Sequence, residues 1–208
     1  MTDLIDKYNR LSSNFSEREY KDPAAYYRRR ARAVIENGPR LEPGERLLDL
    51  GCGDGLAAVP LLDHGADYIG VDASPQMIEV AREHLGGRGR FEVGEIERYA
   101  PPEPVAVTTC FRAVYYASDL RTFFEHVRSY TEKKFLFDFG LRDFPRARVV
   151  GDLYAAGFSR VELRPFLYPQ HYAPPPAVDA VLRAAERTGP LVWPLLKLRF
   201  TYIVAAMP

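Results

Sequence analysis

The run LLDLGCGDG at 47–55 constrains this chain more than any other stretch. Residues 47–50 are apolar except for Asp49 and predict a buried strand. Three glycines follow at alternate positions: Gly51, Gly53 and Gly55. Because glycine has no Cβ, the backbone can turn tightly there and approach a ligand closely. We therefore expect an α/β fold with a ligand at the carboxyl end of this strand.

A second apolar strand at 68–72 ends in Asp72. An acid about 20 residues beyond a glycine turn is where a doubly wound sheet binds the hydroxyls of a ribose. A carboxylate suits that role because it only accepts hydrogen bonds. The two features together predict a nucleoside-containing cofactor, with Asp72 as the ribose ligand.

The spacing of the glycines argues against two common nucleotide-binding motifs. The dinucleotide fingerprint is G-x-G-x-x-G, and Leu56 stands where its third glycine would be. No lysine follows as it does in a phosphate-binding P-loop. The turn carries the acids Asp49 and Asp54 instead, which suit a cationic ligand better than a pyrophosphate.

These residues resemble the class I S-adenosylmethionine-dependent methyltransferases. The first motif of that family is an acid followed by three alternate glycines, matched by Asp49 and the glycine turn. The second motif is an acid closing strand two, and VDASPQMIEVAR at 71–82 is similar to the small-molecule branch. The resemblance implies S-adenosyl-L-methionine as cofactor and methyl transfer, by direct displacement, to a small aromatic, hydrophobic or amine-containing molecule. Two alternatives stay open: a non-catalytic S-adenosylmethionine-binding partner or regulatory protein, and an NAD-dependent oxidoreductase.

Strand and helix patterns alternate along the chain, as in a mostly parallel sheet. The strands are expected at 46–50, 68–72, 91–95, 105–110, 134–140, 158–168 and 197–206. The resemblance implies one α/β, Rossmann-like domain over 1–208. Its seven-stranded sheet has the order 3-2-1-4-5-7-6, with strand seven antiparallel and helices on both faces. Two additions are expected: an N-terminal helical lid at 1–40 and an insertion at 169–196 between strands six and seven, which contains a helix at 177–188.

The resemblance also implies the roles of individual residues around the cofactor. Ala73 and Met77 would flank the adenine. The aromatic spacing of the N-terminal segment separately suggests a helix over the methyl-transfer site, with Tyr27 and Arg30 near the cofactor's carboxylate. The complete set of expected cofactor-binding residues is Tyr27, Arg30, Asp49, Gly51, Cys52, Gly53, Asp72, Ala73, Met77, Glu95, Ile96, Cys110 and Phe111.

A sulfonium methyl group is already activated, so the protein needs alignment, exclusion of water and, where required, a base. The expected catalytic residues are Tyr115 and Tyr116 after strand four and His171 at the start of the insertion. In the related fold these segments meet the N-terminal lid over the methyl group, where Tyr172 and Trp193 would add aromatic rings. Such a lining favours a planar, hydrophobic or cationic substrate. No spacing typical of a metal site is present.

Composition narrows the partners and the compartment. The 28 basic and 28 acidic residues cancel, which disfavours a nucleic-acid substrate. Two cysteines, no signal peptide and no apolar run near 20 residues indicate a cytoplasmic protein without a membrane span. We expect a small-molecule substrate and a monomer or homodimer. The identity of the substrate, the atom methylated, the use of a base and the pathway stay open.

Overall fold

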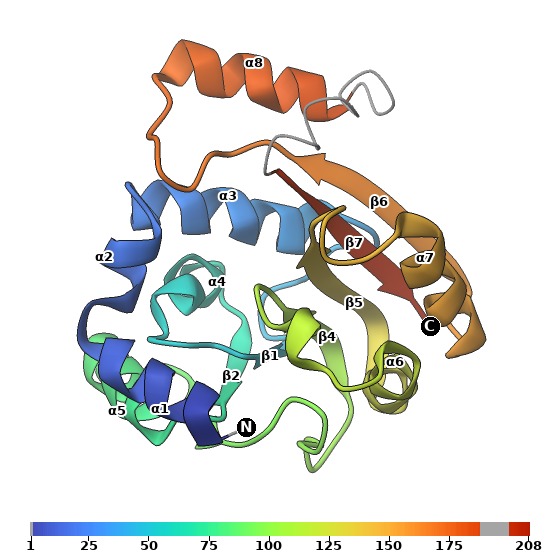
Figure 1. Ribbon diagram of the computed structural model, residues 1–208, viewed down its shortest axis with the longest axis horizontal. Helices are drawn as coiled ribbons and strands as arrows, with labels where there is room; N and C mark the ends of the chain where they lie inside the picture. The colour runs from blue at the N-terminus through green and yellow to red at the C-terminus, as the bar shows by residue number, and fades with distance from the viewer. Residues whose placement is uncertain (1, 188–199) are drawn as a thin grey trace.

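A computed structural model of the chain describes residues 2–187 and 200–208 (Figure 1). Within them, one seven-stranded sheet has the spatial order β3 (Arg90–Val93), β2 (Asp67–Asp72), β1 (Arg46–Leu50), β4 (Val105–Cys110), β5 (Thr131–Phe139), β7 (Thr201–Met207) and β6 (Arg160–Phe166). The first five of these strands pair in parallel. Strand β7 pairs antiparallel with both β5 and β6. The predicted fold class and strand order are confirmed.

The helices alternate with the strands as the sequence predicts. They are α1 (Thr2–Leu11), α2 (Phe15–Glu19), α3 (Pro23–Glu36), α4 (Val59–Asp63), α5 (Pro75–Leu85), α6 (Leu120–Arg128), α7 (Arg146–Ala155) and α8 (Pro176–Arg187). Short 3₁₀ turns are η1 (Ser12–Asn14), η2 (Leu56–Ala58) and η3 (Val114–Tyr116). Ser74 caps α5 by accepting from the amide of Met77, and Asp119 caps α6 by accepting from that of Thr122.

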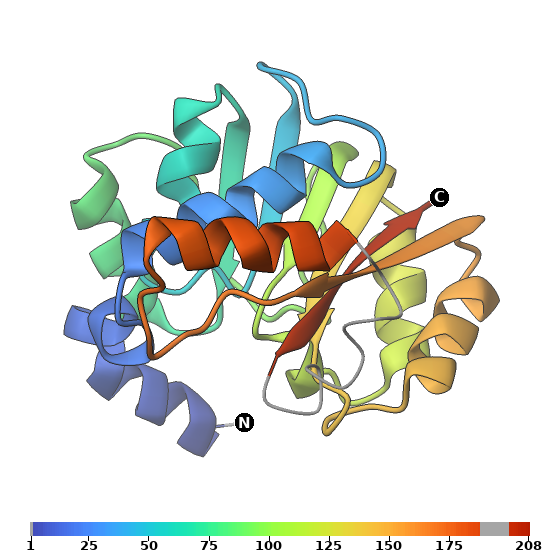
Figure 2. The ribbon, with the colours of Figure 1, turned by 90° about the horizontal axis from the view of Figure 1, so that it is seen from above.

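Alternate side chains of the central strands face opposite helical layers. Leu47 of β1 and Leu136 of β5 pack with α3, α4 and α5. Leu48 of β1 and Phe135 of β5 pack with α6 and α7 on the other face. Figure 2 shows the sheet between these two layers. Strand β5 begins earlier than the predicted 134, because Thr131 already pairs with Val105 of β4. Thr131 Oγ1 also shares a buried hydrogen bond of 2.6 Å with Thr108 Oγ1.

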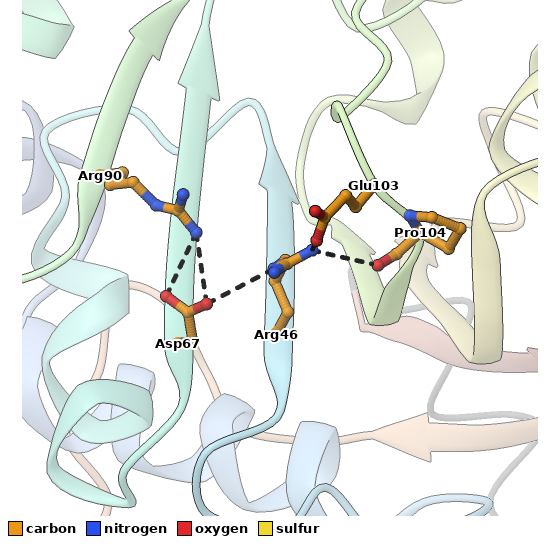
Figure 3. A network of polar contacts seen from close by, with 5 residues as sticks. All are labelled: Arg46, Asp67, Arg90, Glu103 and Pro104. Atoms are coloured by element: carbon orange, nitrogen blue, oxygen red, sulfur yellow. Dashed lines mark hydrogen bonds and ion pairs between the residues drawn. The ribbon is translucent and has the colours of Figure 1, made fainter.

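A row of alternating charges crosses the amino ends of the parallel strands (Figure 3). Asp67 of β2 pairs with Arg90 of β3 at 3.3 Å and with Arg46 of β1 at 3.5 Å. Arg46 also reaches Glu103, just before β4, at 2.8 Å. Exposed pairs of this kind contribute at most about 1 kcal/mol each. They lie at the end of the sheet opposite to the glycine turn.

The insertion helix α8 packs beside β6 and α3. Arg29 of α3 pairs with Asp179 at 3.2 Å and with Glu186 at 2.9 Å, and both acids belong to α8. Glu186 also accepts from the amide of Leu167, just after β6. In Figure 1, α8 and α1 lie on opposite sides of α3.

Helix α3 is fixed to the sheet by a buried lysine. Lys134 of β5 is fully buried, and its Nζ donates to the carbonyls of Val34 at 2.6 Å and Asn37 at 2.7 Å. These carbonyls belong to the carboxyl end of α3, where a cation is favourable. Burial lowers the pKa of Lys134 to about 8.

We predict that Lys134→Met lowers the free energy of unfolding by about 1–3 kcal/mol for each carbonyl left unpaired. Urea denaturation at pH 7 measures the loss. Lys133→Met is the matched control: it removes a part-exposed pair with Glu45 and should cost less than about 1 kcal/mol. Equal losses in the two variants would contradict the role assigned to Lys134.

The lowered pKa of Lys134 adds a dependence on pH to this comparison. Between about pH 8 and pH 10 the unfolded chain holds the Lys134 proton more tightly than the folded chain. The free energy of unfolding of the wild type should therefore rise with pH relative to that of Lys134→Met over this range.

Candidate functional site

A cavity of about 320 Å³ lies at the carboxyl ends of β1, β2 and β4, beneath the N-terminal segment. The lining residues that the sequence predicted are Tyr27, Arg30, Asp49, Gly51, Cys52, Gly53, Asp72, Ala73, Met77, Glu95, Ile96, Phe111, Tyr115 and Tyr116. Segments far apart in the sequence thus meet around one space.

Two predicted site residues do not line this cavity. Cys110 is fully buried in the core on the α6 and α7 side of the sheet, while the next residue, Phe111, reaches the cavity. His171 is exposed and lies in the connection to α8, which docks on α3 through Arg29. Tyr172 is exposed in the same connection. The predicted contribution of Trp193 lies outside the described residues.

The glycine turn is locked to the neighbouring strand by backbone hydrogen bonds. The amides of Gly51 and Cys52 both donate to the carbonyl of Val71, at 2.7 and 3.0 Å. Gly51 has φ +80°, and a Cβ there would lie 2.7 Å from that of Ala113. At Gly53, with φ +57°, a Cβ would meet only the ring of Phe15 at 3.8 Å. Gly51 is therefore required by packing, whereas Gly53 leaves open space beside the cavity.

The two motif acids are held by donors from neighbouring strands and turns. Asp49 is buried and accepts from the hydroxyls of Tyr68 at 2.5 Å and Thr109 at 2.6 Å. Asp72 accepts from the amides of Gly53 at 3.0 Å and Ser74 at 2.9 Å, one on each oxygen. Burial raises the pKa of both carboxyls. Each oxygen of Asp72 keeps a free lone pair for a hydroxyl donor.

The N-terminal segment is tied to the cavity through its first two helices. The amide of Ser16 donates to Asp54 Oδ2 in the glycine turn at 3.0 Å. Ser74 Oγ donates to Asn9 Oδ1 at 2.6 Å, next to Asp72. The hydroxyls of Tyr8 and Tyr116 share a hydrogen bond of 2.5 Å. These contacts hold α1 and α2 over the cavity.

Arg30 of α3 lies in an aromatic surround at the cavity wall. Its guanidinium carbon is 4.9 Å from the ring centroid of Tyr26 and 4.7 Å from that of Phe111. Its one side-chain hydrogen bond among the described residues is a long one, 3.4 Å, to the hydroxyl of Tyr20. The side chain is 8% exposed and has no carboxylate partner in the described part of the chain. A buried guanidinium that makes no ion pair suits an anionic group of a ligand.

The chemistry of the lining favours binding and positioning over covalent catalysis. Burial raises the pKa of the Cys52 and Cys110 thiols, which keeps them protonated and poorly nucleophilic. Burial also raises the pKa of Tyr8 and Tyr115, so these hydroxyls stay protonated at neutral pH. Over residues 2–187 and 200–208, no group of three His, Cys, Asp or Glu side chains could hold a metal ion. The described helices include none long and apolar enough to span a membrane.

Several lining residues were missed by sequence reasoning, including Glu19, Glu97 and Arg112. Tyr8 and Phe15 were expected only as aromatic rings of the N-terminal lid, and Asp54 only as an acid of the glycine turn. The acid in the turn, Asp54, was visible, but its bond to Ser16 links residues that no local pattern connects. The signal for Arg112 was its place directly after Phe111 at the end of β4.

The chain is similar to known methyltransferases in the part that contains the glycine turn and Asp72. A family model described as a methyltransferase domain matches residues 47–134. The mitochondrial ubiquinone biosynthesis O-methyltransferase of Schizosaccharomyces pombe is 35% identical over 86 residues. That match covers 38% of this chain and 31% of the yeast protein, so the chain spans about a third of that relative's length.

Solved structures share the fold over most of the chain. The [4+2]-cyclase SpnF has a TM-score of 0.71 at 15% identity, over 99% of this chain and 95% of that one. Phosphoethanolamine N-methyltransferase 2 of Haemonchus contortus, in complex with S-adenosyl-L-methionine, has a TM-score of 0.61 at 17% identity. That match covers 86% of this chain and 51% of the nematode protein.

We predict that Asp54→Ala loosens the N-terminal segment without unfolding the sheet. A hydrogen bond to a charged acceptor is worth about 1.5–3 kcal/mol, so local opening should become about tenfold more frequent or higher. Limited trypsin digestion followed by mass spectrometry should detect faster cleavage at the exposed Arg10 and Arg18. Asp63→Ala, which removes an exposed pair with Arg88, is the control. Identical digestion of the two variants would refute the anchoring role.

Proposed function

Because the chain belongs to the class I S-adenosylmethionine-dependent methyltransferases, we propose that it binds S-adenosyl-L-methionine and transfers the methyl group to a small molecule. The observation that carries the proposal is that both motif acids, Asp49 and Asp72, and the glycine turn border one cavity. The cavity also holds an unpaired buried cation, Arg30, as a zwitterionic cofactor would require.

The adenosine half of the cofactor is assigned to the end of β2 and the loop after β3. Asp72 would accept from the ribose hydroxyls through its free lone pairs. Ala73 and Met77 would flank the adenine, since the methionine thioether offers a polarizable surface to a ring. Glu95 and Ile96 would meet the edge of the adenine.

The methionine half is assigned to the glycine turn and α3. Gly53 leaves space for close approach of the ligand to the backbone. Arg30 would bind the cofactor's carboxylate, with Tyr27 held beside it by its hydrogen bond of 2.7 Å to Ser16 Oγ. Asp49 would face the cofactor's ammonium group, directly or through water.

The proposed reaction is a direct displacement. When bound, S-adenosyl-L-methionine would supply an electrophilic methyl group for attack by a lone pair of the acceptor, with S-adenosylhomocysteine as the leaving group. Helices α1 and α2 would exclude water, and Tyr8, Tyr115 and Tyr116 would orient the acceptor. The proposal assigns no proton transfer to His171, because it lies away from the cavity lining.

The aromatic lining supports a small, planar or hydrophobic acceptor. The ubiquinone biosynthesis O-methyltransferase named above is consistent with a small-molecule substrate. We also propose that the protein acts in the cytoplasm as a monomer or a homodimer.

A second candidate is a cofactor-binding protein without methyl transfer. The observation that favours it is the close likeness in fold to SpnF, whose name states a cyclase activity. Turnover of methyl-labelled S-adenosylmethionine over a panel of phenols, amines and carboxylic acids separates the two candidates. Calorimetric titration with S-adenosylmethionine, S-adenosylhomocysteine and NAD tests the cofactor itself, and preference for NAD would revive the oxidoreductase alternative.

We predict that Asp72→Ala weakens binding of S-adenosylmethionine by about 2–3 kcal/mol, which is roughly 30–150-fold. Calorimetric titration measures the change. Asp72→Asn, which keeps the size of the side chain, separates loss of the charge from loss of the loop contacts. Asp67→Ala, at the other end of β2, is the control and should bind within a few-fold of the wild type. Unchanged affinity in both Asp72 variants would place the ribose elsewhere.

We also predict that Gly53→Val abolishes cofactor binding while the protein stays folded, because the branched side chain would occupy the ligand's space. Gly44→Val is a matched control: Gly44 has φ +85° and no atom within 4 Å of a Cβ, but lies away from the cavity. Both variants carry a similar backbone cost of about 1–2 kcal/mol, so only cofactor titration should distinguish them. If folded Gly53→Val bound S-adenosylmethionine as tightly as the wild type, the ligand would not approach the backbone closely at Gly53.

A further inference from the structure

Arg112 adopts a backbone conformation that its residue type disfavours. Its φ of 58° is the one positive value outside glycine in the described residues. A left-handed conformation is unfavourable for a residue with a Cβ, and glycine would adopt it freely. The amide of Arg112 donates to Asp138 Oδ1 at 2.6 Å, and Asp138 is buried at the end of β5. Because strained residues cluster at functional sites, this conformation directs attention to the side chain of Arg112.

Arg112 is one of the residues that line the cavity. Within residues 2–187 and 200–208 the structure gives its guanidinium no ion pair and no hydrogen bond. Tyr115, Asp138 and Tyr20 act on it electrostatically, but Asp138 makes no ion pair with it. The guanidinium therefore keeps its hydrogen-bond donors for an anionic group of a ligand.

The position of Arg112 separates it from the residues assigned to the adenosine half of the cofactor. Those residues follow β2 and β3, on one side of β1. Arg112 follows β4, on the other side of β1, and is followed by η3 with Tyr115 and Tyr116. This half of the cavity also receives Tyr8, bonded to Tyr116. Arg112 therefore lies among the rings proposed to hold the methyl acceptor.

Most acids of the cavity lining are already engaged. Asp49, Asp54 and Asp72 accept the hydrogen bonds described above. Glu97 accepts from the amide and hydroxyl of Ser118, at 2.8 and 2.7 Å. Glu95 pairs with Arg98 at 3.2 Å. Glu19 of α2 is the lining acid that has no such partner among the described residues.

Resting on the proposed function, we propose that Arg112 binds the carboxylate of the methyl acceptor, and that the acceptor is an aromatic carboxylic acid. The guanidinium supplies a bidentate partner for the carboxylate, and the tyrosines around it contact the ring. Arg30 stays with the carboxylate of the cofactor, so the cavity uses two guanidiniums for two anionic groups.

The test uses the full chain saturated with S-adenosylhomocysteine and two probes, 4-hydroxybenzoate and 4-hydroxybenzamide. The probes are of similar size and shape and differ in charge. Calorimetry should give the acid at least about tenfold tighter binding than the amide to the wild type. Arg112→Met and Arg112→Gly should abolish that preference, and Arg112→Lys should keep part of it. Glu19→Gln should bind the acid as tightly as the wild type or tighter.

The stability of the Arg112 variants shows whether this side chain binds the acceptor or supports the fold. Because glycine adopts the left-handed conformation freely, Arg112→Gly should keep or raise the urea midpoint and should bind S-adenosylhomocysteine within a few-fold of the wild type. A lower midpoint would show that the side chain supports the fold and would overturn the inference.

The outcomes also separate the two proposals. Failure of the wild type to bind S-adenosylhomocysteine would overturn the proposed function itself. Normal cofactor binding without a preference for the acid, or a preference that survives in Arg112→Met, would overturn only the assignment of Arg112.

Discussion

The carbonyl of Val71 accepts two hydrogen bonds, from the amides of Gly51 and Cys52, and these bonds lock the turn after β1 to the end of β2. With the turn in place, the amide of Gly53 donates to the carboxylate of Asp72, and Gly51, Gly53 and Gly55 all adopt positive φ values. The cavity floor is therefore made of backbone held by neighbouring strands. The order of the sheet then brings the residues after β4 to the other side of the same floor.

The N-terminal segment that covers the cavity is held by a different kind of interaction. It is polar and aromatic and forms short helices. Its position depends on a few side-chain contacts with distant residues, such as Asp54 with Ser16. Such contacts break more readily than the hydrogen bonds between strands, so the N-terminal segment has a lower local stability than the backbone of the cavity floor. The difference suits a site in which ligands must enter, be enclosed and leave.

Sequence reasoning was strongest where structure depends on local pattern. The glycine turn, the strand order and the cavity residues between Asp49 and Ile96 follow from motifs within 47–96 and their resemblance to a known family. It was weakest where position depends on distant docking. The insertion was expected over the cavity, but the pairing of Arg29 with Asp179 and Glu186 holds its helix against the outer side of α3. No pattern near His171 contains that information. Nor does a sequence pattern reveal the left-handed backbone of Arg112, which the buried carboxylate of Asp138 holds.

Helix α3 presents consecutive arginines to opposite surroundings. Arg29 faces the acids of α8 at the outside, and Arg30 faces the rings at the cavity wall. The same helix backbone therefore carries the ion pairs with the insertion and the cation–π contacts of the cavity wall. Helix α3 is the element that joins the insertion to the site, although the insertion helix itself contributes no residue to the lining of the cavity.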